Sequence, residues 1–558
     1  MKTTKTTLAS AIALILMLGC TEKADDKEAV ITAPEKPQPV AEEAEVKRVK
    51  VVAEYDMAAP VAQSRSKQAM LTLHAPPVGG MPGIDAPVFI EDRDNYQETP
   101  SNGVHQVSHS PLSTFSIDVD TGSYANVRSY LNMGRKPPSD AIREEAFINY
   151  FDYQYAAPEN RSQPFSVHTE IAPSPWSEKH QLLRIALKGY DIPNSERKSS
   201  NLVFLVDVSG SMGQPNKLPL LVQSLTVLTK ELREQDTVSL VTYAGNASVV
   251  LKPTKGSEKE EIIQALESLT AGGGTYGESG IKMAYQQARK GFLKDGVNRV
   301  ILATDGDFNV GVTNTDELKK LIAQERDKGV SLTTLGFGRG NYNDAMMEQL
   351  SNIGDGNHAY IDTLHEARKV LLRQMSGTLQ SIASDVKIQI EFNPNVVKEY
   401  RLIGYQNRLL EHEFFNNDAV DAGEIGAGHT VTAFYELTLN GEKGRIDDLR
   451  YQKKEPDSGY QNEVALVKTR YKLPGGSASK LLTSIVKTRE LKESFSQASS
   501  DFQFASAVAA FAQKLKDNKY LDGLSLQEIA DIARKNRGDD PYNYRGEFIS
   551  LVEVAKSL

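Results

Sequence analysis

From residue 201 onward, short apolar runs alternate with amphipathic stretches along the chain. The apolar runs predict strands at 202–206, 237–243, 248–251, 299–303, 331–337 and 358–361. The stretches between them have helical periodicity and predict helices at 218–232, 260–269, 278–289, 316–328, 344–353 and 366–379. Apolar strands that alternate with such helices are typical of a mostly parallel sheet covered on both faces. The pattern therefore predicts an α/β, Rossmann-like domain over residues 198–382.

The pattern differs on the two sides of this domain. An N-terminal companion region over 105–195 has strand-like stretches at 114–120, 165–171 and 182–187 and helix-like stretches at 124–131 and 140–150. After the domain, Val386, Ile388, Ile390 and Phe392 alternate with polar residues, as in a half-buried antiparallel strand. Further strands at 400–404, 430–437 and 464–471 predict a β-sandwich-like region over 384–473.

The last part of the chain, 477–558, is predicted to be helical. Four apolar residues fall on one helix face, namely Phe504, Val508, Phe511 and Leu515. Ser525 and Glu528 have the spacing of a capping box ahead of another helix.

The first residues predict a signal peptide over 1–19. Lys2 and Lys5 precede an apolar run at 8–18, which is too short to span a bilayer, and Gly19-Cys20 closes it. This ending resembles the lipobox of bacterial lipoproteins, with bulky Leu18 as a departure. The resemblance implies lipidation of Cys20 and a lipid-anchored protein of the bacterial cell envelope, and Thr21 favours the outer membrane over the inner one. The alternative is an ordinary signal peptide with a chance cysteine.

Residues 20–104 predict a disordered tether, because prolines recur among Glu, Ala, Lys and Val without periodicity. A small irregular domain is the alternative. The 558 residues carry a net charge of −9, which argues against nucleic acid as a partner. Cys20 is the only cysteine, so the chain has no intrachain disulfide and no cysteine-rich zinc site.

Three loops at the predicted carboxyl ends of strands carry oxygen-bearing side chains. Asp207-Val208-Ser209-Gly210-Ser211 follows the strand at 202–206, Gly272-Gly273-Gly274-Thr275 supplies a hydroxyl, and Thr304-Asp305 follows the strand at 299–303. Ligands of open α/β sheets bind at this edge. Carboxylates and hydroxyls alone favour a hard divalent cation, with Mg²⁺ first and Mn²⁺ or Ca²⁺ as alternatives. Three of the five groups are neutral hydroxyls, so the bound cation would accept a further anionic oxygen.

This combination resembles a von Willebrand factor type A domain, whose metal-ion-dependent adhesion site is D-x-S-x-S with a distant Thr and a distant Asp. The resemblance implies that the metal ligands are Asp207, Ser209, Ser211, Thr275 and Asp305. It also implies that the hydroxyls touch the metal, that the aspartates act directly or through water, and that a partner protein supplies an acidic side chain. The alternative is that these are ordinary turn and cap residues.

Stretches on both sides of the domain resemble a bacterial subfamily of lipid-anchored type A domain proteins, and the match covers 105–558. They read FSIDVDTGSYANVR, INYFDY, NRVILATDGDFNVGV, DVKIQIEFNP and DAGEIGAGHTVTA. We therefore expect an envelope lipoprotein that binds a partner protein through a cation, and no enzyme, because no nucleophile or general base accompanies the five ligands. A metal-assisted hydrolase or protease and a structural envelope scaffold remain as alternatives.

The protease alternative rests on Asp118-Val119-Asp120-Thr121-Gly122-Ser123, which contains the D-T-G-S of aspartic proteases. Such enzymes need two aspartates that share a proton, and a second such loop is absent from the sequence. The more economical interpretation is that Asp120 and Ser123 cap the helix that begins at Tyr124.

Overall fold

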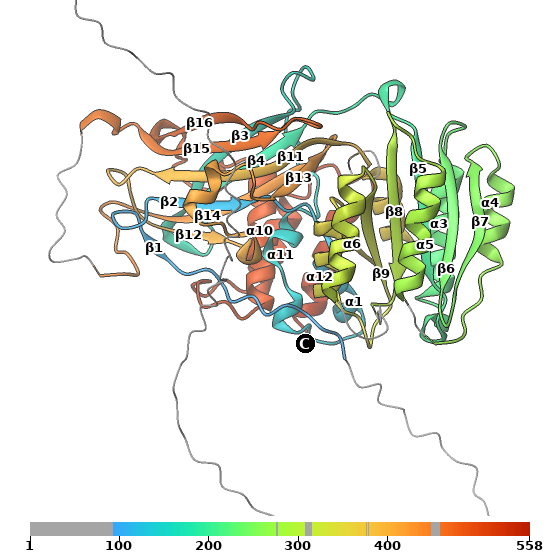
Figure 1. Ribbon diagram of the computed structural model, residues 1–558. Helices are drawn as coiled ribbons and strands as arrows, with labels where there is room; N and C mark the ends of the chain where they lie inside the picture. Colours follow the sequence, from blue (N-terminus) through green and yellow to red (C-terminus); the bar gives the residue numbers. More distant parts are fainter. Residues whose placement is uncertain (1–92, 275–276, 307–314, 375–376, 378, 448–457) are drawn as a thin grey trace, which may run out of the picture. The chain divides into compact units, whose positions relative to one another are not determined.

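The computed structural model describes residues 93–558 apart from 275–276, 307–314, 375–376, 378 and 448–457. The centre of the sequence forms a six-stranded sheet in the order β10-β9-β8-β5-β6-β7, drawn in green and yellow in Figure 1. Neighbouring strands are parallel except β6 and β7, which confirms the predicted sheet. The strands are β5 (Ser200–Asp207), β6 (Thr237–Tyr243), β7 (Ala247–Lys255), β8 (Val297–Thr304), β9 (Ser331–Phe337) and β10 (His358–Ile361).

Helices cover both faces of this sheet because the side chains of β5 alternate between the faces. Leu202, Phe204 and Val206 pack in one core with α3, α4 and α8. Val203 and Leu205 pack in the other core with α5, α6 and α7. The helices are α3 (Leu218–Lys230), α4 (Lys259–Glu267), α5 (Gly277–Lys290), α6 (Thr315–Asp327), α7 (Asp344–Ile353) and α8 (Leu364–Arg368). A π-helical turn over Lys369–Arg373 follows α8, so the single long helix predicted at 366–379 is wrong.

A β-sandwich draws its strands from both sides of residues 200–373, called here the type A segment after the resemblance found in its sequence. One sheet has the order β1-β12-β14-β4-β3, and the other has the order β13-β11-β15-β16 with β2 also paired to β11. The strands are β1 (His105–Gln106), β2 (Leu112–Ser116), β3 (Phe165–Ser174), β4 (Ser177–Gly189), β11 (Ser381–Phe392), β12 (Val397–Ile403), β13 (Gly423–Gly426), β14 (Thr430–Leu439), β15 (Glu463–Lys472) and β16 (Lys480–Lys487). The sandwich is thus wider than the region predicted over 384–473, because four of its strands precede the type A segment.

Helices from both ends of the described chain pack together in a third core. They are α1 (Gly122–Asn132), α2 (Glu144–Ile148), α10 (Ser500–Leu515), α11 (Leu526–Lys535) and α12 (Tyr544–Ala555). The predicted capping box of α11 is confirmed, since Ser525 and Glu528 bond each other's backbone N–H groups. The single tryptophan, Trp176, is buried in this core and donates from Nε1 to Glu436 Oε1 at 2.9 Å. The 3₁₀ turns are Ser139–Ala141, Asn194–Glu196, Gly210–Gly213, Gln406–Arg408, His412–Asn416, Ser458–Tyr460, Thr488–Glu490 and Phe495–Gln497.

Several predicted elements end elsewhere, and the reasons are tertiary. The helix predicted at 140–150 is interrupted because Ile142 and Arg143 are extended, with φ of −100° and −107°, and Arg143 reaches the type A segment. The strand predicted at 114–120 ends at Ser116. Residues 477–558 are not wholly helical, because β16 comes first. Residues 93–104 do not belong to a disordered tether, since the Asn95 backbone N–H donates to Tyr342 O at 2.7 Å.

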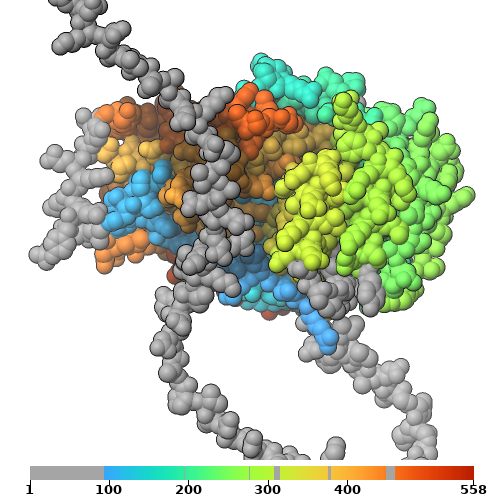
Figure 2. All heavy atoms as spheres, in the orientation of Figure 1, coloured from blue at the N-terminus to red at the C-terminus, as the bar shows by residue number. Residues whose placement is uncertain are grey.

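Buried ion pairs join the type A segment to the parts that flank it, whose surfaces meet in Figure 2. Arg128 of α1, whose side chain is fully buried, donates to Asp362 and Glu366 of the type A segment and to Glu547 of α12. Arg143 pairs with Asp344 at 2.5 Å. Within the described part of the chain, no helix is long and apolar enough to cross a membrane.

Candidate metal centre

Asp207 is the last residue of β5 and lies at the carboxyl edge of the parallel sheet. Its carboxylate is buried and is held by three elements. Oδ1 accepts a hydrogen bond from the Ser209 backbone N–H at 2.9 Å. Oδ2 accepts from the hydroxyls of Thr304 at 2.9 Å and Tyr243 at 3.2 Å, which end the two neighbouring strands β8 and β6. These donors fix the orientation of the carboxylate before any ligand arrives.

The hydroxyls of Ser209 and Ser211 lie side by side in the turn that follows β5. Their Oγ atoms are 3.1 Å apart. Adjacent ligands of an octahedral Mg²⁺, each at about 2.1 Å from the ion, are separated by about 3.0 Å. Ser209 is buried while Ser211 is exposed, so the pair leads from the interior to the surface. This spacing fits two neighbouring ligands of one cation.

The glycine-rich loop is tied directly to the D-x-S-x-S loop. The Gly272 backbone N–H donates to Val208 O at 2.7 Å, and the Gly210 N–H donates to Gly273 O at 3.1 Å. These two bonds hold the glycine-rich loop beside the D-x-S-x-S loop. The predicted ligand Thr275, which follows Gly274, lies outside the described residues.

Asp305 follows β8 and is fully buried. Its Oδ2 accepts a hydrogen bond from the Lys217 ammonium at 2.8 Å, and Lys217 is itself 3% exposed. Sequence reasoning missed Lys217. The available signal was its position immediately before the helix predicted at 218–232, on the same loop as Ser211. The Lys217 ammonium offsets part of the carboxylate charge that a cation would meet here.

Burial, with a smaller contribution from the nearby Asp305 carboxylate, raises the pKa of Asp207 to about 6. Hydrogen bonds from Ser209 and Thr304 act in the opposite direction. A divalent cation beside Asp207 favours the charged form and lowers this pKa. Cation binding is therefore expected to weaken below about pH 6, where the Asp207 carboxylate takes up a proton.

The structure brings four of the five predicted ligands to one edge of the sheet, namely Asp207, Ser209, Ser211 and Asp305. Val206 and Ala303 are paired across β5 and β8, so Asp207 and Asp305 leave neighbouring strand ends. These four side chains offer only oxygen atoms as metal ligands, which fits a hard divalent cation. Residues 271–274 and Ser211 are exposed, so a partner can approach this edge.

The D-T-G-S segment has a different role from the one predicted. The N-cap of α1 is Thr121, and no side chain caps this helix, so the prediction that Asp120 and Ser123 cap it is wrong. The Ser123 hydroxyl donates to Ala141 O at 2.6 Å, and Asp120 Oδ1 accepts from the His358 backbone N–H at 2.8 Å. Asp120 is 4% exposed.

A mostly parallel sheet with helices on both faces and a D-x-S-x-S loop at its carboxyl edge defines a von Willebrand factor type A domain. Family profiles agree with this class. The profile described as "von Willebrand factor type A domain" matches residues 201–374, "von Willebrand factor" matches 90–184, and "Uncharacterized protein YfbK, C-terminal" matches 377–558.

One relative is similar along most of the chain. "Uncharacterized protein YfbK" of Escherichia coli (strain K12) is 48% identical over 471 residues, which are 83% of this chain and 81% of that protein. The chain therefore belongs to the YfbK family of bacterial type A domain proteins. "Uncharacterized protein sll0103" of Synechocystis is 25% identical over 61% of this chain and 77% of its own length. A solved "von Willebrand factor type A" protein from Catenulispora acidiphila aligns with a TM-score of 0.39 at 14% identity, over 71% of this chain and 91% of its own.

Proposed function

We propose that this protein binds a partner protein in the bacterial cell envelope through a divalent cation held by Asp207, Ser209, Ser211, Thr275 and Asp305. The observation that carries the proposal is the oxygen-only cluster at the carboxyl edge of the sheet. There the Ser209 and Ser211 hydroxyls are 3.1 Å apart and the Asp207 carboxylate is held by three donors. Type A domains are usually interaction modules and commonly hold such a cation.

The charge at the site would leave the bound cation able to accept a further ligand from a partner protein. Ser209, Ser211 and Thr275 are neutral, and the Asp305 carboxylate already pairs with the Lys217 ammonium. A Mg²⁺ ion in this setting keeps much of its positive charge and a place for another oxygen. A glutamate or aspartate side chain of the partner is the ligand that suits this place. Exposed Ser211 and the exposed glycine loop surround the position where that side chain arrives.

Cation binding is tested first, by titrating the protein with Mg²⁺ in a calorimeter. Asp207→Ala and Ser209→Ala are expected to lose one equivalent of bound Mg²⁺. Asp295→Asn serves as the matched control, because Asp295 is exposed on the loop before β8. Unchanged Mg²⁺ binding in both site variants would remove the basis of the proposal.

Partner binding is tested by retention from solubilised envelope extract, with the full chain as bait. A protein retained in Mg²⁺, released by EDTA, lost with Asp207→Ala and kept with Asp295→Asn supports the proposal and identifies the partner. Equal retention under all four conditions means that the contact is made elsewhere. The scaffold alternative has its own signature: Ser209→Ala lowers the melting temperature and leaves every interaction unchanged.

Anchoring at Cys20 is a separate part of the proposal. It rests on the Lys2, Lys5 and 8–18 pattern that ends in Gly19-Cys20, a segment outside the described residues. Cys20→Ser should abolish incorporation of labelled fatty acid and move the protein out of the membrane fraction. A Cys20→Ser protein that still takes up the label contradicts this assignment.

A further inference from the structure

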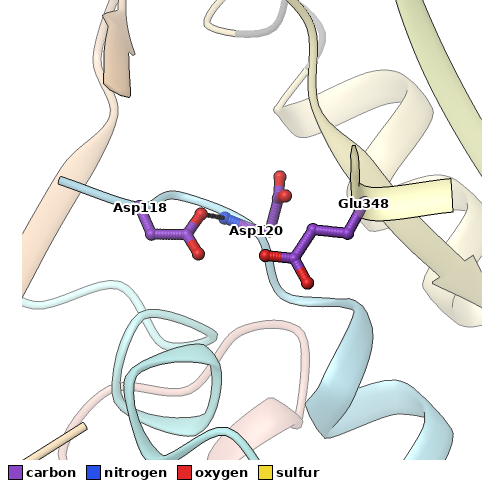
Figure 3. Close-up of side chains that lie close together, drawn as sticks. All are labelled: Asp118, Asp120 and Glu348. Atoms are coloured by element: carbon purple, nitrogen blue, oxygen red, sulfur yellow. Dashed lines mark hydrogen bonds between the residues drawn. The ribbon is translucent and has the colours of Figure 1, made fainter. Parts of the chain in front are cut away.

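Three buried carboxylates meet where the loop after β2 reaches helix α7. Asp118 and Asp120 belong to that loop, and Glu348 belongs to α7 of the type A domain (Figure 3). Each offers a carboxylate oxygen within 4.8 Å of the other two. The three residues are 7%, 4% and 4% exposed, respectively. Like charges this close and this deeply buried repel each other unless something positive lies between them.

Neighbouring donors satisfy five of the six oxygens of this cluster. Asp118 Oδ1 accepts from the Asp120 backbone N–H at 3.0 Å, and Asp118 Oδ2 accepts from Arg408 Nε at 3.1 Å. Asp120 Oδ1 accepts from the His358 N–H at 2.8 Å. Glu348 Oε1 accepts from Arg408 Nη2 at 2.8 Å, and its Oε2 accepts from Arg143 Nη1 at 2.9 Å.

The sixth oxygen, Asp120 Oδ2, is buried without a hydrogen-bond partner among the described residues. A buried carboxylate oxygen in this state costs free energy unless a donor or a cation occupies its lone pairs. Burial and then the charge of Asp118 raise the pKa of Asp120 well above its ordinary value, which reflects the same shortage of positive charge.

The charges in the bonded network do not balance. The guanidinium groups of Arg143 and Arg408 pair with three carboxylates, those of Asp118, Asp344 and Glu348. The Asp120 carboxylate is a fourth negative charge beside them. This leaves two negative charges uncompensated. A divalent cation would supply the missing charge.

The cluster also has space beside it. A cavity of about 40 Å³ is lined by Asp118 and Asp120, together with Asn352, Asn357 and Arg408 among others. A cavity needs roughly 10–15 Å³, measured in the same way, to hold one water molecule. The cavity therefore has room beside the two aspartates for one ion with a water or two.

We propose that Asp118, Asp120 and Glu348 hold a hard divalent cation, such as Ca²⁺, which ties the loop after β2 to helix α7. Two oxygens bound to one Ca²⁺ ion, each at about 2.3–2.6 Å from it, lie at most about 5.2 Å apart. The three carboxylate oxygens all lie within 4.8 Å of one another, so they can bind one such ion.

This site is separate from the one at Asp207. Asp120 is bonded to His358, the first residue of β10, and β10 is the third strand from β5 in the sheet. At the usual strand spacing the two sites are about 14 Å apart or more. The second cation would therefore join the companion region to the type A domain without contacting a ligand bound at Asp207.

The test counts bound Mn²⁺ by electron paramagnetic resonance in the full chain, because Mn²⁺ is accepted by both oxygen sites. We expect two Mn²⁺ in the wild type, one in Asp207→Ala, one in Asp120→Asn and none in the double variant. Asp120→Asn is nearly isosteric and keeps the Oδ1 acceptor for His358. Asp295→Asn, at an exposed position, is the control and should bind two. The proposal is overturned if Asp207→Ala binds none, or if Asp120→Asn still binds two.

A thermal measurement guards against a variant that fails to fold. In the Asp207→Ala background, Ca²⁺ should raise the melting temperature relative to EDTA, and Asp120→Asn or Glu348→Gln should remove this rise. In EDTA, Asp120→Asn should melt no lower than its parent, because it removes one of the repelling charges. No Ca²⁺ effect in Asp207→Ala means that a proton balances the cluster, and the proposal fails while the function proposed for Asp207 stands.

Discussion

Replacing Arg128 by Met should loosen the joint between the type A domain and the helices that pack against it. The Arg128 side chain is fully buried and donates to Asp362 Oδ2 at 2.8 Å, to Glu366 Oε2 at 2.8 Å and to Glu547 Oε2 at 2.9 Å. Met fills much of the same volume and donates nothing. The Asp362 and Glu366 carboxylates, 5% and 1% exposed, then lose their main positive partner.

The magnitude follows from this burial. Removing one partner of a buried ion pair costs about 3–5 kcal/mol. The Tyr150 hydroxyl still donates to Glu366 at 2.6 Å, so we expect the lower end of this range, about 3 kcal/mol of unfolding free energy. With a urea dependence of about 3 kcal/mol per M, the unfolding midpoint falls by about 1 M.

The assay is urea unfolding at pH 7 followed by tryptophan fluorescence. Trp176 is the only tryptophan, is 3% exposed and lies in the same core as Tyr124 of α1 and Phe548 of α12, so its emission reports on the joint. Arg326→Met is the matched control. Its ion pairs, with Asp327 among others, are largely exposed, so this variant should lose less than about 1 kcal/mol.

A second variant separates lost charge from lost packing. Adding Asp362→Asn to Arg128→Met removes one uncompensated charge and should restore part of the lost stability. An Arg128→Met midpoint equal to that of Arg326→Met would refute the electrostatic reasoning outright. A large loss without any recovery in the double variant would assign the effect to packing instead.

Three further predictions concern the metal centre and the domain joint. Lys217→Met should raise Mg²⁺ affinity about tenfold, equivalent to about 1.4 kcal/mol, because the cation then meets the buried Asp305 carboxylate without a competing ammonium; equal affinities by calorimetry would show that the two do not compete. Gly306→Ala should lower the free energy of unfolding by about 1–3 kcal/mol and weaken Mg²⁺ binding, because φ at Gly306 is +91° and a Cβ would lie 2.4 Å from a backbone nitrogen. A Cβ at Gly272 would meet open space, so Gly272→Ala should unfold like the wild type. Burial, and then Asp355, raises the pKa of Glu424 from 4.5 to about 8, so the folded state holds this proton more tightly and the free energy of unfolding declines as pH rises between these values. Glu424→Gln should therefore raise the urea midpoint at pH 8 more than at pH 5. An equal change at both pH values would contradict the pKa shift.

Local patterns accounted for the elements that bury one continuous face. The strands at 237–243, 331–337 and 358–361 and the helix at 344–353 have the predicted bounds, because apolar periodicity and strand length are properties of the segment itself. The capping box at Ser525 needs only residues three apart. The common location of four predicted ligands was predictable for a similar reason, since these residues follow directly from strands whose carboxyl ends share an edge.

Other features depended on contacts between distant segments. Strands on both sides of the type A domain, such as β2 and β11, pair with each other, and no local pattern encodes which strand meets which. The helix predicted at 140–150 is interrupted where Arg143 forms an ion pair with Asp344. The bond from Lys217 to Asp305 also joins separate loops.

By itself, the sequence determined the α/β class, the order of strands and helices in the type A domain and the D-x-S-x-S loop with its oxygen chemistry. Each of these rests on spacing within one segment or on residue types that suit one kind of ligand. Only the tertiary structure decided how the flanking strands share one sandwich and how Asp118 and Asp120 come to face Glu348. The physical reason is that charge balance and burial are set by what surrounds a side chain, and those surroundings come from residues far away along the chain.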